Sequence, residues 1–219
     1  MIPKPGKDIS LVTSYRPISL LSILSKLFEK IFSDIISTYI ETHQIITMHQ
    51  FGFRKKHSTT EQVHRIVTLI RKTFEDKQYC SALFIDISEA FDRVWHDGLI
   101  LKICTLLPPN SHKLLKCYLT NRSFIVKSKN YSSNSRKISA GVPQGSILGP
   151  LLYILYTADM PTHPRTHTST FADDTAFMCM HKNSSVATNI LQYIGRSMKA
   201  SSRQCLKNTA AVTPMRPVL

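Results

Sequence analysis

Acidic residues are scarce in this chain of 219 residues, which carries 14 Asp and Glu against 28 Lys and Arg and a formal net charge of +14 at pH 7. Such an excess predicts a polyanionic partner, nucleic acid in the first place and an acidic membrane surface in the second. A basic protein with no such partner is the alternative that charge alone leaves open. Acid is rarest from residue 98 to residue 219, where Asp159, Asp173 and Asp174 stand against fifteen Lys and Arg.

The chain also lacks any Cys-x-x-Cys pair, which argues against a zinc site or a disulfide framework. The five cysteines lie in apolar stretches and are expected to be reduced core residues of an intracellular protein, nuclear or cytoplasmic. They are Cys80, Cys104, Cys117, Cys179 and Cys205. No apolar run has the length of a membrane-spanning helix, and the first ten residues, "MIPKPGKDIS", lack the layout of a signal peptide. No membrane partner is therefore expected.

Helices and short strands alternate along the chain without the regular rhythm of a doubly wound sheet, which favours an α+β fold. Apolar residues at helical spacing predict the first long helix, and Ser58 and Glu61 form a capping box at the start of the second. Helices are expected over residues 20–43, 58–76, 98–107, 111–123, 151–160 and 184–200. Hairpins are expected over residues 2–21, 124–140 and 169–180, and a buried strand over residues 81–88.

Asp173 and Asp174 lie in the apolar run "TSTFADDTAFMCM", at the expected turn of a hairpin, and Asp86 ends the apolar strand "LFID". If the two strands are neighbours, the three carboxylates converge. Crowded carboxylates repel one another, and hard cations such as Mg²⁺ select carboxylate oxygens as ligands. From these residues alone the simpler interpretation stays open, in which the two adjacent Asp residues only cap a surface turn.

Two kinds of loop add to this pattern. The Gly- and Pro-rich stretch "GVPQGSILGP" allows a close backbone approach to a ligand, which Gln144 could hydrogen-bond. The basic loops "SYRPISL" and "FGFRKKHS" supply side chains suited to phosphates. Those side chains are Arg16, Arg54, Lys55 and Lys56. Each loop alone is equally compatible with a solvated surface.

Six stretches together resemble the successive motifs of reverse transcriptases, most closely those of non-LTR retrotransposons of the LINE type and, among them, insect jockey-like elements. In order they are "IPKPGKD", "SYRPISLL", "FGFRKKHST", "LFIDISEAFDRVWH", "AGVPQGSILGPLLY" and "FADDTAF". The resemblance covers roughly residues 1–180. It implies one reverse transcriptase domain with fingers-like residues 1–80, palm residues 81–195, and an antiparallel palm sheet whose catalytic β-hairpin packs on helices.

By this resemblance, Asp86, Asp173 and Asp174 correspond to the catalytic, metal-binding aspartates of the polymerase palm, with Asp174 the less direct ligand. The main-chain carbonyl of Ile87 is a further ligand by the same correspondence. Two Mg²⁺ ions are implied as cofactors, with Mn²⁺ able to substitute.

The resemblance also assigns substrate contacts. Phe91 corresponds to the aromatic gate under the incoming sugar, and Gln144 and Gly145 to the loop that touches the nucleotide. Arg16 corresponds to the arginine that holds the triphosphate, with help from Lys4 or Lys7, and Arg54 is a further phosphate contact. By contrast, Glu89, Asp92 and Asp97 are expected to be structural or solvent-facing, and His57 and His96 are not expected to be ligands.

The implied activity is RNA-directed DNA polymerisation, a nucleotidyl transfer with an RNA template, a DNA primer and dNTP as partners; the oligomeric state stays open. The sequence departs from the family at its ends, since it starts at the fingers hairpin and no thumb or endonuclease is recognisable. Residues 196–219 diverge and are expected to be poorly ordered. The alternative function is therefore a truncated, catalytically inactive remnant that binds nucleic acid.

Overall fold

The structure, a computed structural model, describes residues 2–87, 89–128, 131–201 and 211–215. The chain folds into two compact units, each assembled from segments that are distant in sequence. The first unit contains Met1–Ile45 and Phe91–Tyr156, and the second contains Ile46–Ala90 and Thr157–Leu219. These units do not follow the expected boundary at residue 80, and the assignment of fingers and palm stays a prediction.

Helices dominate the first unit. They are α1 (Ile23–Thr42), α3 (His96–Leu106), α4 (Pro109–Leu119) and α5 (Leu148–Tyr156), with a 3-10 turn η1 (Val12–Ser14). Its strands form short antiparallel pairs, which confirms the two hairpins expected in this part of the chain. These pairs are β1 (Ile2–Pro3) with β2 (Tyr15–Arg16), β4 (Ser123–Phe124) with β7 (Arg136–Lys137), and β5 (Lys127–Ser128) with β6 (Tyr131–Ser132).

A buried carboxylate joins three helices of this unit. Glu29 on α1 is 1% exposed, and its Oε2 accepts hydrogen bonds from the backbone N–H groups of Ile147 (2.7 Å) and Leu148 (3.4 Å). The Tyr118 hydroxyl on α4 donates to its Oε1 at 3.0 Å. Because the first N–H groups of a helix lack partners within the helix, the carboxylate satisfies the start of α5 and complements its dipole.

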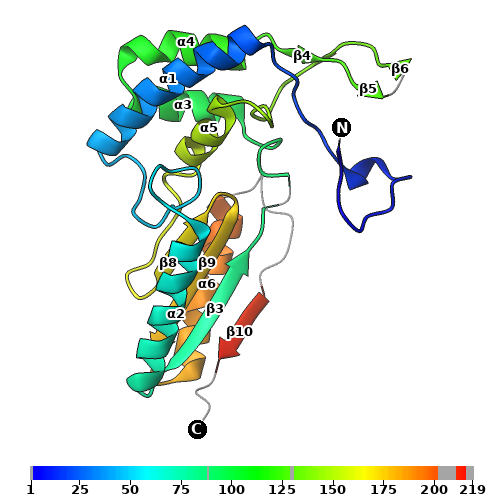
Figure 1. Cartoon of the computed structure of the whole chain (residues 1–219). Helices are drawn as coiled ribbons and strands as arrows, with labels where there is room; N and C mark the ends of the chain where they lie inside the picture. Colours follow the sequence, from blue (N-terminus) through cyan, green and yellow to red (C-terminus); the bar gives the residue numbers. More distant parts are fainter. Residues whose placement is uncertain (1, 88, 129–130, 202–210, 216–219) are drawn as a thin grey trace. The chain divides into compact units, whose positions relative to one another are not determined.

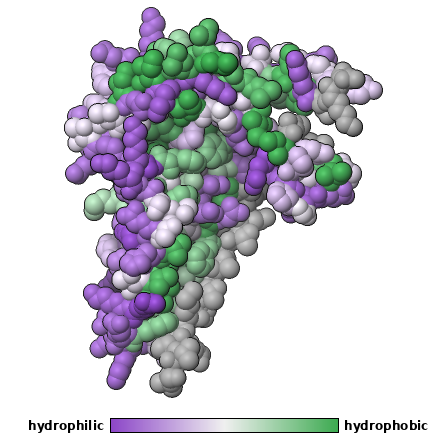
Figure 2. All heavy atoms as spheres, viewed as in Figure 1, coloured by the Kyte–Doolittle hydropathy of each residue, from purple (hydrophilic) through white to green (hydrophobic). Residues whose placement is uncertain are grey.

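The buried side of α1 differs from the apolar stripe that predicted the helix. Ile36 and Ile40 are 1% and 2% exposed and share a side with Glu29, whereas Ile23 and Leu24 are 85% and 79% exposed. Hydrophobic surface is visible around the helices of this unit in Figure 2. Helical spacing therefore identified the helix correctly but did not identify the side that packs.

The second unit is a four-stranded antiparallel sheet between two helices, with strand order β10-β3-β9-β8. In Figure 1, α2 and α6 lie on opposite faces of this sheet. The strands are β3 (Tyr79–Ile85), β8 (His167–Phe171), β9 (Asp174–His181) and β10 (Ala211–Met215), and the helices are α2 (Thr59–Glu75) and α6 (Ser184–Ser201). The buried strand, the Asp-containing hairpin and the last helix are thereby confirmed.

Alternation along the strands explains how both faces are covered. Cys80, Ala82 and Met178 point to one face and pack against α2 through Ile66 and Ile70. On the other face, the Cδ2 atom of Leu83 lies 3.6 Å from the Cβ position of Gly195 on α6. Because both faces of the sheet are buried at β3, the sequence of this strand, "YCSALFI", is almost continuously apolar. At the start of α2, Ser58 accepts a hydrogen bond from the Glu61 N–H at 3.1 Å, which confirms the predicted cap.

Two described segments near the end of the chain have regular secondary structure, and the expected poor order of residues 196–219 stays a prediction. Helix α6 continues to Ser201, and β10 pairs antiparallel with β3 from Ala211 opposite Phe84 to Met215 opposite Cys80. This pairing satisfies backbone groups of β3 that would otherwise form an open sheet edge. Residues 202–210 and 216–219 of the divergent tail lie outside the described part of the chain.

Two of the five cysteines contradict the expectation of core positions. Cys80 and Cys179 are buried, and burial raises the pKa of both thiols, but Cys104 and Cys117 are exposed on α3 and α4. Cys205 lies outside the described residues. Over the described part of the chain, no helix is both long and apolar enough to cross a membrane.

We predict that Glu29→Ala lowers the free energy of unfolding by about 2–4 kcal/mol, because it leaves buried N–H groups and the Tyr118 hydroxyl without their acceptor. Urea titration of the full chain measures this change. Glu41→Ala is the matched control, because Glu41 is an exposed carboxylate on the same helix; it should change stability by less than about 0.5 kcal/mol. Equal effects of the two substitutions would refute the capping role of Glu29.

Candidate functional site

Strands β8 and β9 form a tight hairpin whose last facing pair is Phe171 and Asp174. The two residues between them, Ala172 and Asp173, make the turn, and Ala172 has a φ of 59°. A positive φ at the first central position suits two-residue hairpin turns, although the side chain of alanine makes it unfavourable. Asp173 therefore lies at the tip of the hairpin, as the sequence predicted.

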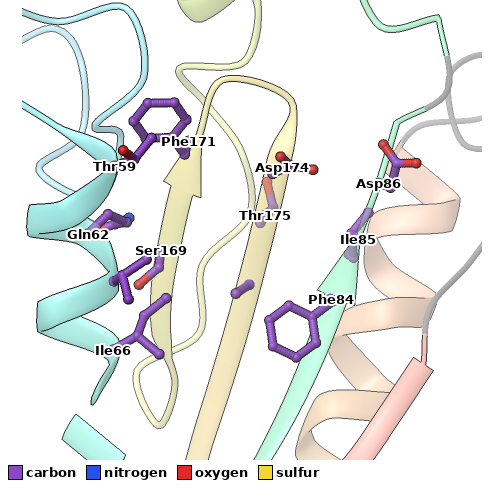
Figure 3. A pocket seen from close by; sticks show the side chains of 12 residues that line it. Thr59, Gln62, Ile66, Phe84, Ile85, Asp86, Ser169, Phe171, Asp174 and Thr175 are labelled. Carbon is purple, nitrogen blue, oxygen red and sulfur yellow. The ribbon is translucent and has the colours of Figure 1, made fainter. Parts of the chain in front are cut away.

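The register between β3 and β9 brings Asp86 to the same end of the sheet. Ile85 faces Thr175, Asp86 directly follows Ile85, and Asp174 directly precedes Thr175. Alternation places Asp86 on the same face as Phe84, and Asp174 on the same face as Ala176. Since Phe84 and Ala176 are cross-strand partners, both aspartates lie on one face of the sheet. The expected neighbourhood of the two acidic strands is thus confirmed, and Figure 3 shows both carboxylates at this end.

A pocket of about 360 Å³ lies beside these carboxylates, between the first turns of α2 and the sheet. Its walls are mostly apolar, with Phe84 and Phe171 from the strands and Val63 and Ile66 from α2, while Asp86 and Asp174 line one end (Figure 3). Phe84 is 48% exposed here. The site therefore combines anionic groups with open space beside them.

The electrostatics of the site favour a cation. The pKa of the Asp174 carboxyl is raised above its usual range by burial first, and then by the negative charges of Asp173 and Asp86. All three causes disfavour the ionised form of Asp174, and two of them are the charges of the neighbouring aspartates. A cation bound at this end of the sheet would reverse the unfavourable terms.

The donor chemistry fits a hard divalent cation, because every candidate ligand is an oxygen. Within residues 2–87, 89–128, 131–201 and 211–215, however, no three His, Cys, Asp or Glu side chains form a group that could hold a metal ion. Holding one would require the carboxylates of Asp86, Asp173 and Asp174 to draw together. Ile87, the source of the expected carbonyl ligand, follows Asp86 and has a buried side chain.

The expected nucleotide contacts lie in the first unit. The Phe91 ring stacks on Tyr153 with a centroid distance of 4.8 Å. The amide nitrogen of Gln144 donates to both carboxylate oxygens of Asp92, at 3.0 and 2.9 Å. Gly145 has a φ of +93°, and an added Cβ would approach Ile18 and Ser19 to 3.2 Å. The Gly-rich loop is thus held close to neighbouring backbone, and Asp92 has the structural position that the sequence analysis expected.

The basic candidates have different environments. In the first unit, Arg16 on β2 is exposed and Lys4 donates through Nζ to the Thr13 carbonyl at 3.0 Å. In the second unit, Arg54 donates to the carbonyls of Thr47 and Gln50, at 3.3 Å each. Arg54 therefore stabilises its own loop in this structure, whereas Arg16 presents its charge to solvent.

Two residues near the hairpin were missed by the sequence analysis. Gln50 is 5% exposed and hydrogen-bonds the backbone of Ala172, and Gly52 packs against the same turn. In the sequence, their role was indicated by a Gln and a Gly that stand beside the two Phe residues in "HQFGF", just before the basic residues of this loop.

Residues 2–207 match the family described as reverse transcriptase (RNA-dependent DNA polymerase). The chain belongs to this family. The match covers most of both units and all three aspartates, so these carboxylates lie within a reverse transcriptase domain.

Individual relatives show which kind of reverse transcriptase this chain is similar to. The chain is 50% identical over 186 residues to a probable RNA-directed DNA polymerase from transposon BS of Drosophila melanogaster, covering 81% of this chain and 20% of that protein. It is 44% identical over 200 residues to the RNA-directed DNA polymerase from the mobile element jockey of the same species, covering 88% and 22%. The chain thus spans about a fifth of the length of these relatives. The predicted non-LTR, jockey-like ancestry is confirmed.

Solved structures support the fold. A telomerase of Candida tropicalis in complex with a fragment of telomeric RNA matches with a TM-score of 0.63 at 14% identity, over 88% of this chain and 34% of that one. The apo telomerase truncated from its C-terminal domain matches with a TM-score of 0.61 at 15% identity, over 87% and 41%. At such low identity the likeness supports the α+β, fingers-palm type of fold and nothing further.

We predict that Asp173→Asn lowers the pKa of the Asp174 carboxyl towards its ordinary value of 3.8, because it removes one of the two negative charges that raise it. Carboxyl ¹³C NMR in metal-free protein follows the titration. The matched control is Asp76→Asn, since Asp76 caps α2 just before β3 begins, at the opposite end of the strand from Asp86. A pKa unchanged by Asp173→Asn would contradict the proposed coupling.

Proposed function

We propose that this chain is the polymerising domain of an RNA-directed DNA polymerase, which adds dNTP to a primer 3′-OH under the direction of an RNA template. The observation that carries the proposal is the facing end of β3 and β9, where Asp86 and Asp174 line one pocket beside Asp173 on the hairpin turn. Membership of the reverse transcriptase family supports this interpretation of three adjoining carboxylates.

In this proposal Asp86, Asp173 and Asp174 hold two Mg²⁺ ions, with the carbonyl of Ile87 as a further ligand and Mn²⁺ able to replace Mg²⁺. When bound, such a pair of ions activates the attacking 3′-OH and stabilises the charge on the α-phosphate and the departing pyrophosphate. The contribution of the three aspartates would be to supply oxygen ligands from the end of β3, the hairpin turn and the start of β9.

Residues of the first unit position the nucleotide. Arg16 is exposed and pairs with the triphosphate, helped by Lys4. Gln144 and Gly145 contact the nucleotide from the Gly-rich loop, and Gln144 exchanges its hydrogen bonds to Asp92 when it does so. Phe91 lies under the sugar, and Arg54 of the second unit contacts phosphate. Orientation and charge stabilisation then supply most of the rate, as is general for such transfers.

The nucleic acids are held largely by charge. With 28 Lys and Arg against 14 Asp and Glu, the chain can neutralise many template and primer phosphates. Each neutralised phosphate releases condensed counterions, so affinity should fall steeply as salt concentration rises.

A primer-extension assay on poly(rA)/oligo(dT) with Mg²⁺ or Mn²⁺ tests the activity directly. We expect incorporation of dTTP by the wild-type chain and its loss in Asp173→Ala, because the hairpin tip then lacks a metal ligand. Asp76→Ala is the control, since that carboxylate is remote from the hairpin and incorporation should persist. RNA binding without incorporation, unchanged by Asp173→Ala, would instead support the alternative of an inactive nucleic-acid-binding remnant.

Sugar selection gives a second test. We predict that Phe91→Ala raises the kcat/KM for ribonucleotides relative to deoxyribonucleotides by about tenfold or more, because removal of the ring makes room for a 2′-OH. Phe91→Tyr keeps the ring and its stacking on Tyr153, so it should keep the discrimination. Single-nucleotide incorporation kinetics measure both variants. Unchanged selectivity in Phe91→Ala would refute the gate.

A further inference from the structure

We infer that Gln50 is a positioning residue that holds the Ala172–Asp173 turn and thereby orients the Asp173 carboxylate. Its Oε1 accepts hydrogen bonds from the backbone N–H of Ala172 (3.1 Å) and of Gly52 (2.8 Å). Its Nε2 donates to the Ala172 carbonyl at 3.3 Å. One buried side chain thus binds both backbone polar groups of the residue that precedes Asp173.

Ala172 needs such support because its φ of 59° is a conformation that L-residues other than glycine rarely adopt. A residue held in that region persists where the surrounding structure fixes it. Gln50 supplies two of the fixing contacts, and its amide is held in one orientation because two N–H donors converge on the same oxygen. The turn can then present Asp173 in a single direction.

The loop that carries Gln50 is itself tied to the hairpin. The Phe51 N–H donates to the Thr170 carbonyl and the Thr170 N–H donates to the His49 carbonyl, both at 2.9 Å. A Cβ added to Gly52 would lie 2.1 Å from the Ala172 nitrogen, so this position requires glycine. Residues 49–52 therefore extend the edge of β8 and deliver Gln50 to the turn.

Gln62 offers a matched comparison. It is also 5% exposed, and its Nε2 donates to the carbonyls of Thr170 and His49, at 3.3 Å each. It therefore anchors the same loop and strand without touching Ala172. The isosteric substitutions Gln50→Met and Gln62→Met remove a buried amide of equal size, and only the first removes contacts to the turn.

The first test uses metal-free protein labelled with ¹⁵N-alanine and measures amide hydrogen exchange at Ala172 by NMR. Gln50→Met should raise the exchange rate of the Ala172 N–H roughly tenfold, because that group loses its acceptor. Gln62→Met should leave it unchanged. An unchanged rate in Gln50→Met, or an equal rise in both variants, would overturn the positioning role.

The second test rests on the proposed function. In primer extension, Gln50→Met should lower kcat roughly tenfold or more with little change in the KM for dNTP, since it displaces a ligand used in the chemical step. Asp76→Asn, at the opposite end of β3 from the site, should keep the wild-type kcat. A wild-type kcat in Gln50→Met would overturn the catalytic consequence. If the wild-type chain shows no incorporation, the proposed function fails, while the exchange experiment still decides the role of Gln50.

Discussion

The pairing register of β3 against β9 is the constraint on which the site depends. With Ile85 opposite Thr175, Asp86 just after β3 and Asp174 at the start of β9 lie at the same end of the sheet and on the same face. Side chains alternate with a period of two, so a slip by one residue would turn one carboxylate to the α6 face. Burial of both faces fixes that register, because the same slip would also exchange Ala82 and Leu83 between the packing surfaces of α2 and α6.

A second constraint concerns the tip of the hairpin. A left-handed alanine costs about 1–2 kcal/mol relative to a right-handed one, and Ala172 occupies that conformation next to Asp173. The Gln50 side chain offsets this cost with hydrogen bonds to the Ala172 backbone, and Gly52 allows a close approach that a Cβ would prevent. The strain and its compensation come from segments more than 100 residues apart in sequence.

This separation explains which parts of the structure could be predicted. The helix cap at Ser58, the β8–β9 hairpin and the strand before Asp86 follow from local patterns, and each is present. The capping of α5 by Glu29 could not be read from neighbours, because Glu29 meets Leu148 across 119 residues. For the same reason, the apolar stripe of α1 did not predict which side of that helix is buried. Helical spacing fixes which residues share a side, but the partners on other helices decide which side is buried.

The carboxylates of this basic chain have two different kinds of environment. Glu29 is buried, and its charge is met by backbone N–H groups at the start of α5 and by the Tyr118 hydroxyl, so its role is complete within the fold. At the end of β9, every cause acting on Asp174 raises its pKa: burial, Asp173 and Asp86. The negative charges of Asp173 and Asp86 therefore act on Asp174 near the hairpin turn, although a bound metal ion would require the three carboxylates to draw closer together. A divalent cation bound there would lower the electrostatic cost of this arrangement, which gives the proposed metal site a physical basis in the apoprotein itself.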